Sequence, residues 1–342
     1  MFSGCGGSDL GLVGGFHFLG KEYKKLPYEI VFALDNDAKA VDTYNRNFDV
    51  PATLADIEDF DIKKIPDFDV LMGGFPCQSF STVNPTKNPF DKRGKLYKRM
   101  SKILDEKKPK YFIAENVKGL VMLQGGKIFD EVIKDFAAQG YVVKYKVFNA
   151  ADYGVPQKRE RVFIIGIRKD VAFNFQFPEP TNSQFGTDNN KWIGLKNVID
   201  SLKPKDPKYY FSKKAVEGMK KAKKNMKRGL AQDLENPCLT ITSHLAKVSL
   251  NSRDPVLLVD KKKELYRRFS PLEAARIQSF PDQFEFLGSD ASAYKQIGNA
   301  IPPVLMWHIA NALQIQAKKE NKAYGGHILP KKAKRNNVAY PL

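Results

Sequence analysis

The chain has 342 residues, 42% of them hydrophobic and 12% aromatic, which allows a large α/β domain with a second, smaller one. The formal net charge of +18 favours a polyanion, most simply nucleic acid, as the partner, and a solvated lysine-rich surface is the alternative. No apolar run of about 18 residues, signal-peptide pattern or metal-ligand spacing of cysteines is present, which excludes membrane, secreted disulfide-rich and cysteine–metal classes and favours a reducing cytoplasm.

Apolar strand-like runs alternate with amphipathic helical segments through the first half of the chain. Helices are predicted from Asp9 onward, around Ala38, Val41 and Tyr44, and before Pro109. This alternation indicates a doubly wound α/β sheet. Strands are predicted at residues 30–34, 70–72, 111–114, 142–148 and 161–167.

A glycine-rich turn opens the chain at residues 2–7, with the sequence Phe-Ser-Gly-Cys-Gly-Gly. Such a turn brings backbone N–H groups close to a ligand. Asp35 follows the predicted strand at 30–34, where a carboxylate can hold the two hydroxyls of a ribose. Asp56 can accept a hydrogen bond from an adenine amino group, and either carboxylate can instead be a helix cap.

A second candidate site follows the strand at 70–72, where residues 73–81 read Gly-Gly-Phe-Pro-Cys-Gln-Ser-Phe-Ser. Open α/β sheets place their sites at the carboxyl ends of such strands. The glycines allow a sharp turn and Pro76 fixes it, so Cys77 is expected on a loop as a candidate nucleophile. The alternative is an inert buried cysteine, which is what we expect of Cys5.

Charged residues end or begin the neighbouring strands. Glu115 follows the strand at 111–114 and is expected at the same sheet edge as Cys77. Burial would raise its pKa and let it protonate a ring nitrogen, whereas a helix N-terminus is the plain alternative. Arg159 and Arg161 are expected on one face, where they flank an anion or a carbonyl or form a structural ion pair.

The composition changes near residue 171, where Pro, Asn and Lys become frequent and a domain boundary is predicted. Residues 191–228 contain 13 Lys and Arg against 3 Asp and Glu, which accounts for more than half of the net charge. Val216 and Met219 are expected to face a core from a lysine-rich helix, and an apolar helix is predicted at 304–315.

Six segments in a fixed order resemble the motifs of the DNA cytosine-5 methyltransferase family of bacterial restriction–modification systems. A single tripeptide match would be weak evidence, but six motifs in the family's order are specific to it. The resemblance extends from residue 2 to about residue 315. It implies an α/β fold with a Rossmann-like S-adenosylmethionine-dependent methyltransferase sheet and a smaller target-recognition domain. The segments are residues 2–7, Pro-Cys-Gln at 76–78, Glu-Asn-Val at 115–117, Gln-Lys-Arg-Glu-Arg at 157–161, residues 268–281 and Gln-Ile-Gly-Asn at 296–299.

The resemblance also implies a domain division. Residues 1–175 form the catalytic and cofactor-binding domain, and residues 176–287 form the target-recognition domain. Residues 288–342 contain a helix that returns to the catalytic domain and a basic tail. Arg268, Glu273 and Arg276 are expected to hold the small domain together.

The implied activity is that of a DNA (cytosine-5-)-methyltransferase, which makes 5-methylcytosine in double-stranded DNA with S-adenosylmethionine as donor and without a metal. The target cytosine is flipped out of the duplex and Cys77 adds to its carbon 6. Glu115 holds nitrogen 3 and the exocyclic amine, Arg161 supports the base carbonyl, and Arg159 helps to order the loop. A tRNA cytosine-5 methyltransferase and a catalytically silent DNA-binding relative are the alternatives.

The family motifs assign further residues to two groups. A polar loop at 79–97 is expected to close over the base, and the Thr-Ile-Thr at 240–242 resembles the family's short recognition signature. The protein is expected to be a monomer, with a cognate restriction endonuclease as a partner. The cofactor-binding residues are Phe2, Gly4, Gly6, Gly7, Asp35, Asp56, Ile57, Pro76, Leu96 and Asn299. The DNA-binding residues are Gln78, Ser81, Arg93, Thr240, Ile241, Lys247 and Arg253.

The start of the chain departs from the family pattern. Members usually have a strand and an acidic residue before the phenylalanine of the glycine turn, whereas here Met1 directly precedes Phe2. The alternatives are a misassigned start, a truncated chain or a sheet that tolerates the missing strand. Asn36 also stands where many members place a larger residue beside the adenine.

Overall fold

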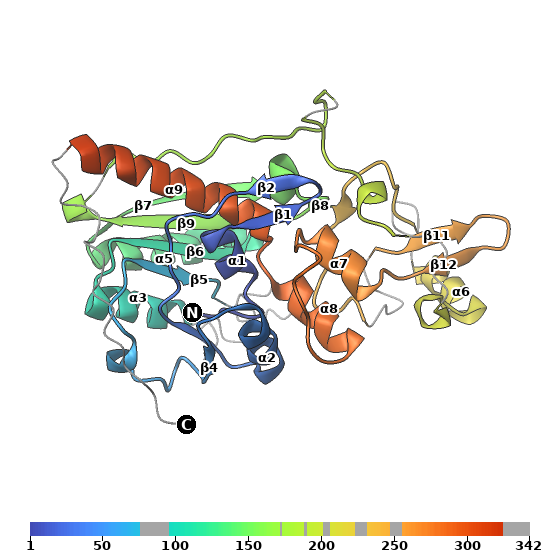
Figure 1. Ribbon diagram of the computed structural model, residues 1–342, viewed down its shortest axis with the longest axis horizontal. Helices are drawn as coiled ribbons and strands as arrows, with labels where there is room; N and C mark the ends of the chain where they lie inside the picture. The colour runs from blue at the N-terminus through green and yellow to red at the C-terminus, as the bar shows by residue number, and fades with distance from the viewer. Residues whose placement is uncertain are drawn as a thin grey trace.

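The computed structural model describes residues 1–75, 96–171, 173–187, 190–200, 206–222, 231–246 and 255–323. A large lobe contains a layered sheet, and a smaller lobe extends from one end of it (Figure 1). Within the described ranges, no helix has both the length and the apolar character needed to cross a membrane.

The main sheet is four-stranded, in the order β5-β6-β9-β7. Strand β5 runs parallel to β6, whereas β9 is antiparallel to both of its neighbours. The four corresponding predicted strands are therefore confirmed, each slightly longer than the sequence pattern indicated. Their bounds are Val70–Gly73 for β5, Tyr111–Val117 for β6, Glu160–Arg168 for β9 and Tyr141–Asn149 for β7.

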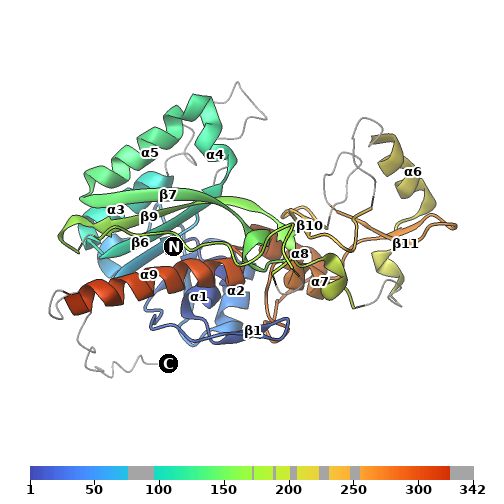
Figure 2. The ribbon, with the colours of Figure 1, turned by 90° about the horizontal axis from the view of Figure 1, so that it is seen from above.

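Helices cover both faces of this sheet, as Figure 2 shows. Alternate residues of β6 divide between the two cores, because Phe112 packs with the α3 and α5 side and Ile113 packs with the α1 and α9 side. This confirms the doubly wound arrangement, with α1 beginning two residues before the predicted Asp9 and α9 extending beyond 304–315. The helix bounds are Gly7–Val13 for α1, Leu96–Lys107 for α3, Gly119–Met122 for α4, Lys127–Ala138 for α5 and Pro303–Ala323 for α9.

Strands β3 (Ala33–Asp35) and β4 (Ala52–Leu54) form a separate parallel pair, with α2 (Ala38–Asn47) packed on it. Residues 1–3 connect this pair to the main sheet: the Met1 ammonium donates to the Met72 carbonyl (2.9 Å), and the Ser3 N–H donates to the Leu34 carbonyl (3.1 Å). The strand predicted at 30–34 is wrong in its bounds. Among the described residues, 30–32 pair with no neighbouring strand, so regular β structure begins only at Ala33.

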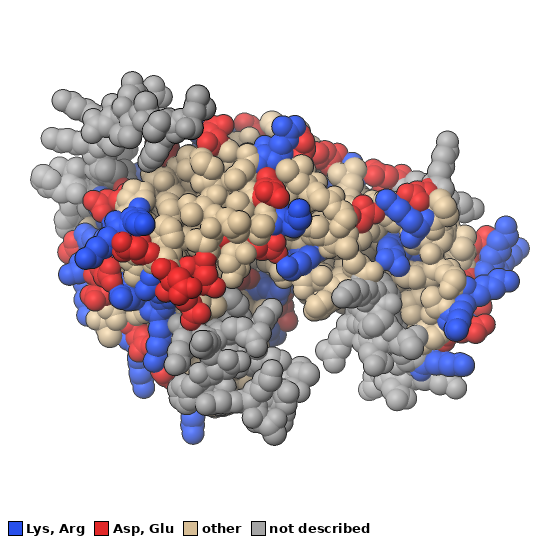
Figure 3. All heavy atoms as spheres, turned by 90° about the horizontal axis from the view of Figure 1, so that it is seen from below, with Lys and Arg blue, Asp and Glu red and all other residues tan. Residues whose placement is uncertain are grey.

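The smaller lobe contains α6 (Lys213–Ala222) and the antiparallel strands β11 (Leu257–Asp260) and β12 (Leu265–Arg267). Val216 and Met219 are buried against Val256, which confirms the predicted apolar face of α6. Figure 3 shows that Lys and Arg side chains gather at the far end of this lobe.

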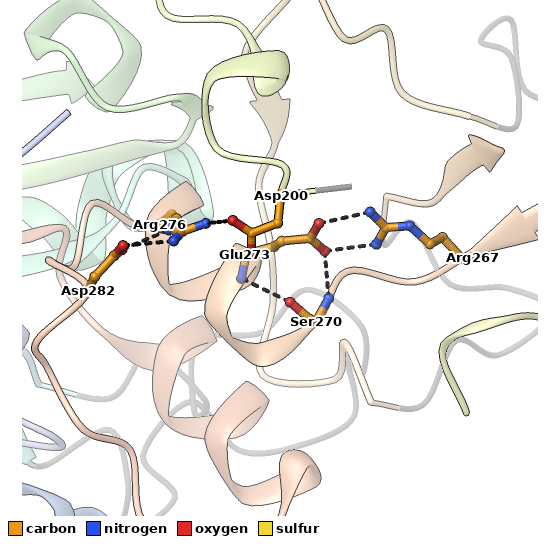
Figure 4. A network of polar contacts seen from close by, with 6 residues as sticks. All are labelled: Asp200, Arg267, Ser270, Glu273, Arg276 and Asp282. Atoms are coloured by element: carbon orange, nitrogen blue, oxygen red, sulfur yellow. Dashed lines mark hydrogen bonds and ion pairs between the residues drawn. The ribbon is translucent and has the colours of Figure 1, made fainter. Parts of the chain in front are cut away.

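A buried ion pair joins β12 to α7 (Pro271–Ile277). Arg267 and Glu273 are almost fully buried, 2.8 Å apart, and Glu273 also completes a capping box with Ser270 (Figure 4). Arg268, which was also expected to help hold the small domain together, makes separate contacts within it: it donates to the Ala246 carbonyl and lies over the Phe211 ring. Successive side chains of an extended segment point to opposite sides, so only one of two adjacent arginines can face α7.

Arg276, near the other end of α7, lies between Asp200 and Asp282 (Figure 4). Its Nε is 2.7 Å from Asp282 Oδ1. The expected structural role of Glu273 and Arg276 agrees with these contacts. The other described elements are β1 (Phe16–Phe18), β2 (Lys21–Tyr23), β8 (Gln157–Lys158), β10 (Cys238–Leu239) and α8 (Asp290–Asn299).

His308 of α9 is 9% exposed and lies among the rings of Tyr23, Tyr153 and Trp307. Burial, aided by the charge of Lys21, lowers its pKa from 6.5 to about 4. The unfolded chain therefore binds a proton at a higher pH than the folded chain does, and stability is lost as the pH falls from about 6.5 to about 4. We expect a loss of about 3 kcal/mol over this window.

Urea unfolding of the wild type and of His308→Phe at pH 7 and pH 4.5 measures this contribution. The variant keeps a ring at the site but cannot titrate, so it should gain about 2–3 kcal/mol relative to the wild type at the lower pH. His17→Asn is the control for loss of a histidine at an exposed position. An equal stability difference at both pH values would contradict the assignment to His308.

Candidate active site

The glycine turn is tightly packed on one side and open on the other. Gly6 has a φ of +95°, and a Cβ placed on it would lie 2.2 Å from Phe48 Cε2. A Cβ on Gly7 would lie 2.6 Å from the Ile301 carbonyl oxygen and 3.2 Å from Ala300 Cβ. At Gly4, by contrast, a Cβ would meet nothing within 4 Å. The loop thus offers room for a ligand above Gly4 while its other glycines allow close backbone packing.

Several predicted cofactor residues meet at this turn. Asp35 accepts hydrogen bonds from the Gly4 N–H (2.8 Å) and the Asp37 N–H (2.9 Å), which fixes the end of β3 against the loop. Gly7 lies against residues 300 and 301, so the exposed Asn299 is brought to the same region by the end of α8. The turn, β3 and α8 therefore converge as the sequence predicted.

The remaining described cofactor candidates line neighbouring segments. Asp56 is exposed and accepts from the Glu58 N–H, whereas the Ile57 side chain is buried and its carbonyl accepts from Arg99. Phe2 and Leu96 are half-buried at the edge of the core on the α3 side. Cys5 is buried, which raises the pKa of its thiol to about 12 and confirms that it is not a reactive cysteine.

Replacing Gly6 by alanine should weaken the glycine turn. The new Cβ would collide with Phe48 and would also disfavour the positive φ, so we expect a loss of about 1–3 kcal/mol of unfolding free energy and weaker cofactor binding. Urea unfolding and calorimetric titration with S-adenosylhomocysteine measure both effects. Gly20→Ala is the matched control for the positive φ alone, because a Cβ there meets nothing within 4 Å; equal effects of the two substitutions would contradict the packing argument.

The carboxyl ends of β5 and β6 lie side by side, because Gly73 pairs with Ala114 in the parallel register. A Cβ on Gly74 would lie 3.4 Å from Glu115 Oε2, and Asn116 Nδ2 donates to the Phe75 carbonyl (2.9 Å). The chain leading toward Cys77 is therefore held against Glu115. The predicted residues Pro76, Cys77, Gln78, Ser81, Arg93, Lys247 and Arg253, and most of the loop at 79–97, lie outside the described residues.

Glu115 and Arg161 form an ion pair at this edge. Arg161 Nε lies 3.0 Å from Glu115 Oε1, and the two side chains are only 14% and 12% exposed. Burial raises the pKa of Glu115, and the positive charges of Arg161 and Arg159 partly oppose that shift. A carboxyl group in these surroundings can retain a proton at higher pH than an exposed one, as proton donation to a base requires.

Arg159 differs from Arg161 in its surroundings. It is 2% exposed and donates to the carbonyls of Ile241 (3.2 Å), Gly298 (3.0 Å) and Ala300 (3.1 Å). Burial lowers its pKa, and the charge of Arg161 acts in the same direction. Arg159 therefore holds backbone segments together, whereas Arg161 reaches Glu115.

The two described DNA-binding candidates lie on a segment fixed to the large lobe. Strand β10 pairs in parallel with β8, and Thr240 Oγ1 donates to the Lys158 carbonyl (2.7 Å). Ile241 is fully buried, and both of its backbone groups are bonded to side chains, so its side chain presents no surface to DNA. Its assignment as a DNA contact is corrected on this ground: the tripeptide signature marks the segment, but its apolar residue anchors it.

Two residues that contact the candidate site were not predicted individually from the sequence. Asn116 fixes the start of the Cys77 loop, and Gln157 accepts from the Ile241 N–H (3.0 Å). Both stand inside motifs recognised as tripeptides or pentapeptides, beside more conspicuous charged residues. A polar amide next to an apolar strand was the available signal, because buried amides are normally hydrogen-bonded.

Comparison with known proteins agrees with this geometry. The chain is 34% identical over 344 residues to Type II methyltransferase M.NgoFVII of Neisseria gonorrhoeae, with 92% of this chain and 85% of that protein covered. It is 33% identical to Type II methyltransferase M.FnuDI of Fusobacterium nucleatum, with 92% and 93% covered. Its fold resembles that of the S. pombe Dnmt2 methyltransferase, with a TM-score of 0.69, 18% identity, and 92% and 97% of the two chains covered.

A family model described as C-5 cytosine-specific DNA methylase matches residues 1–315. That span includes the glycine turn, the Glu115–Arg161 pair and the segment that leads to Cys77. The chain therefore belongs to the C-5 cytosine-specific DNA methylases and is a sequence-specific DNA cytosine-5 methyltransferase.

Proposed function

We propose that Cys77, Glu115 and Arg161 form the catalytic centre of this methyltransferase. The observation that carries the proposal is the buried Glu115–Arg161 pair at the sheet edge where Gly74 and Phe75 lead toward Cys77. A carboxyl group with a raised pKa beside a fixed guanidinium suits a polar, planar base better than an apolar ligand.

In the proposed mechanism, the Cys77 thiolate adds to carbon 6 of the cytosine, and the ring becomes an enamine that is nucleophilic at carbon 5. Glu115 holds nitrogen 3 and the exocyclic amine and supplies the proton that neutralises the ring as the carbon–sulfur bond forms. Arg161 donates to the base carbonyl and stabilises the charge that develops there. After methylation, a base, for which we propose water, removes the carbon 5 proton; the electrons of that C–H bond restore the double bond between carbons 5 and 6 and expel the Cys77 thiolate, and nitrogen 3 returns its proton to Glu115.

Enzymes of this family use S-adenosylmethionine, which supplies a methyl group activated by a sulfonium. The backbone at Gly4 is unobstructed on its Cβ side, and we propose that the glycine turn, Asp35, Asp56, Ile57 and Asn299 hold the cofactor. Asp35 suits the ribose, because its carboxylate is already oriented by the N–H groups of Gly4 and Asp37. Phe2, Pro76 and Leu96 supply apolar contacts in this proposal.

DNA recognition is proposed for residues 176–287. The lysine-rich end of the small lobe supports phosphate contacts, which fix a protein on the duplex without reading its sequence. Thr240, Lys247 and Arg253 are the candidates for base edges, with Gln78, Ser81 and Arg93 beside the flipped cytosine. Residues 1–175 and 288–342 form the catalytic domain and its returning helix in this division.

We propose a cognate restriction endonuclease as a partner, in keeping with the name Type II methyltransferase that the relatives carry, and we propose that the methyltransferase itself acts as a monomer in the bacterial cytoplasm. One recognition lobe per catalytic lobe supports this stoichiometry.

The test is transfer of labelled methyl from S-adenosylmethionine to unmodified duplex DNA, with tRNA in parallel, followed by sequencing for 5-methylcytosine. We expect incorporation at one short DNA motif. Incorporation into tRNA alone would assign the substrate to the RNA alternative, and incorporation into neither would contradict the activity.

A further inference from the structure

A buried network of side-chain amides connects the recognition signature to the catalytic strand. Gln157 and Gln278 are fully buried, and Gln157 Nε2 donates to Gln278 Oε1. Gln157 Oε1 accepts from the Ile241 N–H (3.0 Å), while Arg159 Nη1 donates to the Ile241 carbonyl (3.2 Å). Both backbone groups of Ile241 are thus held by side chains that immediately precede β9.

The network continues to the segment that carries Asn299. Gln278 Nε2 donates to the Ala300 carbonyl (2.5 Å), which also accepts from Arg159. A Cβ on Gly298 would lie 2.2 Å from the Thr242 carbonyl carbon, so the two backbones are in direct contact there. The segment at 240–242 is therefore confined between β8, Arg159 and the end of α8.

These contacts fix the position of the segment at 240–242, because each buried polar group has a particular partner. Leaving one of these groups without a partner costs about 1–3 kcal/mol, so a shift of the segment would be unfavourable in free energy. Arg161 follows Arg159 by two residues on the same extended chain. The network thus fixes the distance between the signature segment and the guanidinium that faces Glu115.

We propose that Gln157 is a positioning residue for methyl transfer. With Gln278, it holds the 240–242 segment in register with the pocket, so that DNA read by the recognition lobe presents its cytosine to Glu115 and Arg161. This inference rests on the proposed function, since it takes residues 176–287 as the recognition domain. Loss of the Gln157 amide should impair productive DNA binding and site discrimination more than the chemistry of a bound cytosine.

The chain offers a matched control. Gln316 of α9 also holds a backbone segment through its amide, but at an exposed site: it accepts from the Gln176 N–H (2.8 Å) and donates to the Gln176 carbonyl (2.8 Å). Gln316→Leu removes these bonds in the C-terminal half of α9, and the C-terminal end of α9 lies away from α7 and α8 (Figure 1). Gln157→Glu keeps the acceptor for Ile241 but loses the donor to Gln278. Gln278→Met removes the contacts to Gln157 and to the Ala300 carbonyl without touching Ile241.

The experiment measures kcat and KM for duplex DNA that contains the site found by sequencing, and for the same duplex with one base pair of the site changed. For Gln157→Leu, we expect KM for the correct site to rise about 10-fold and discrimination between the two duplexes to fall about 10-fold, with kcat changed less than about 3-fold. Gln157→Glu should restore most of the discrimination, Gln278→Met should lose part of it, and Gln316→Leu should match the wild type.

Unchanged discrimination in folded Gln157→Leu, a loss confined to kcat, or equal damage in Gln157→Leu and Gln157→Glu would each overturn the proposal. If Gln157→Leu does not fold, full discrimination in folded Gln278→Met would overturn the proposal instead. Methylation by the wild type without any site preference would contradict the proposed recognition function. This result is measured on the wild type, whereas the results that would overturn the role of Gln157 are measured on the variants.

Discussion

Replacing Cys77 by serine is expected to lower kcat for DNA methylation at least ~10³-fold while leaving duplex binding within a few-fold of the wild type. A serine hydroxyl keeps the size of the thiol, but almost none of it is ionised near neutral pH, and it is a poor nucleophile for carbon 6. The loss therefore falls on bond formation and spares the contacts that hold the DNA. Methyl transfer under single-turnover conditions and fluorescence anisotropy with labelled duplex measure the two quantities.

DNA with 5-fluorocytosine at the target position provides an independent readout. Fluorine at carbon 5 cannot leave as a proton does, so the adduct with Cys77 cannot resolve after methylation. The wild type should form a denaturant-resistant complex with this DNA in the presence of S-adenosylmethionine, and Cys77→Ser should form none. Turnover by Cys77→Ser within tenfold of the wild type would exclude a covalent role for Cys77.

The second large effect is expected for Glu115→Gln, which should lower kcat by about 10²–10³-fold. Glutamine has nearly the same shape, but it cannot pass a proton to nitrogen 3 and does not balance the charge of Arg161. We also expect a modest loss of unfolding free energy, of about 1–3 kcal/mol, because Arg161 is largely buried and would lose its ionic partner.

Glu160→Gln is the control for this substitution. Glu160 stands next to Arg161 in the chain, but it is half exposed and pairs with Lys118 at 2.8 Å. An exposed pair contributes little, so its loss should change kcat less than about 3-fold. Comparable defects in Glu160→Gln and Glu115→Gln would mean that general charge at this edge, rather than the buried carboxyl group, supports the reaction.

The main sheet could be predicted from the sequence because the pattern that identifies each strand lies within the strand itself. Strands β5, β6, β7 and β9 each contain their own apolar pattern, and Glu115 lies at the predicted edge because parallel neighbours end together. The bounds of β3 could not be predicted in the same way. A strand needs hydrogen-bonding neighbours, and residues 30–32 have an apolar sequence without a described partner strand.

The candidate site was predicted as segments more accurately than as side chains. Motif order placed Arg159 and Ile241 near the pocket, but it did not show that one is bonded to three carbonyls and that the other is buried. The pairing of Arg267 with Glu273 was not predicted, for a related reason. Such contacts depend on which side of a segment faces residues that are distant in sequence. A local sequence pattern does not contain that information.

The attachment of the 240–242 segment has a consequence for how target specificity can diverge. Gln157 and Arg159 bind the N–H and carbonyl of residue 241, and Gly298 meets the backbone of Thr242. Every residue type except proline has both backbone groups, and the buried Ile241 side chain anchors the segment, so these contacts place few demands on the neighbouring residues. If residues 176–287 read the DNA as proposed, descendants of such an enzyme can acquire new DNA sites by exchanging residues on either side of the anchored segment while the catalytic lobe stays the same.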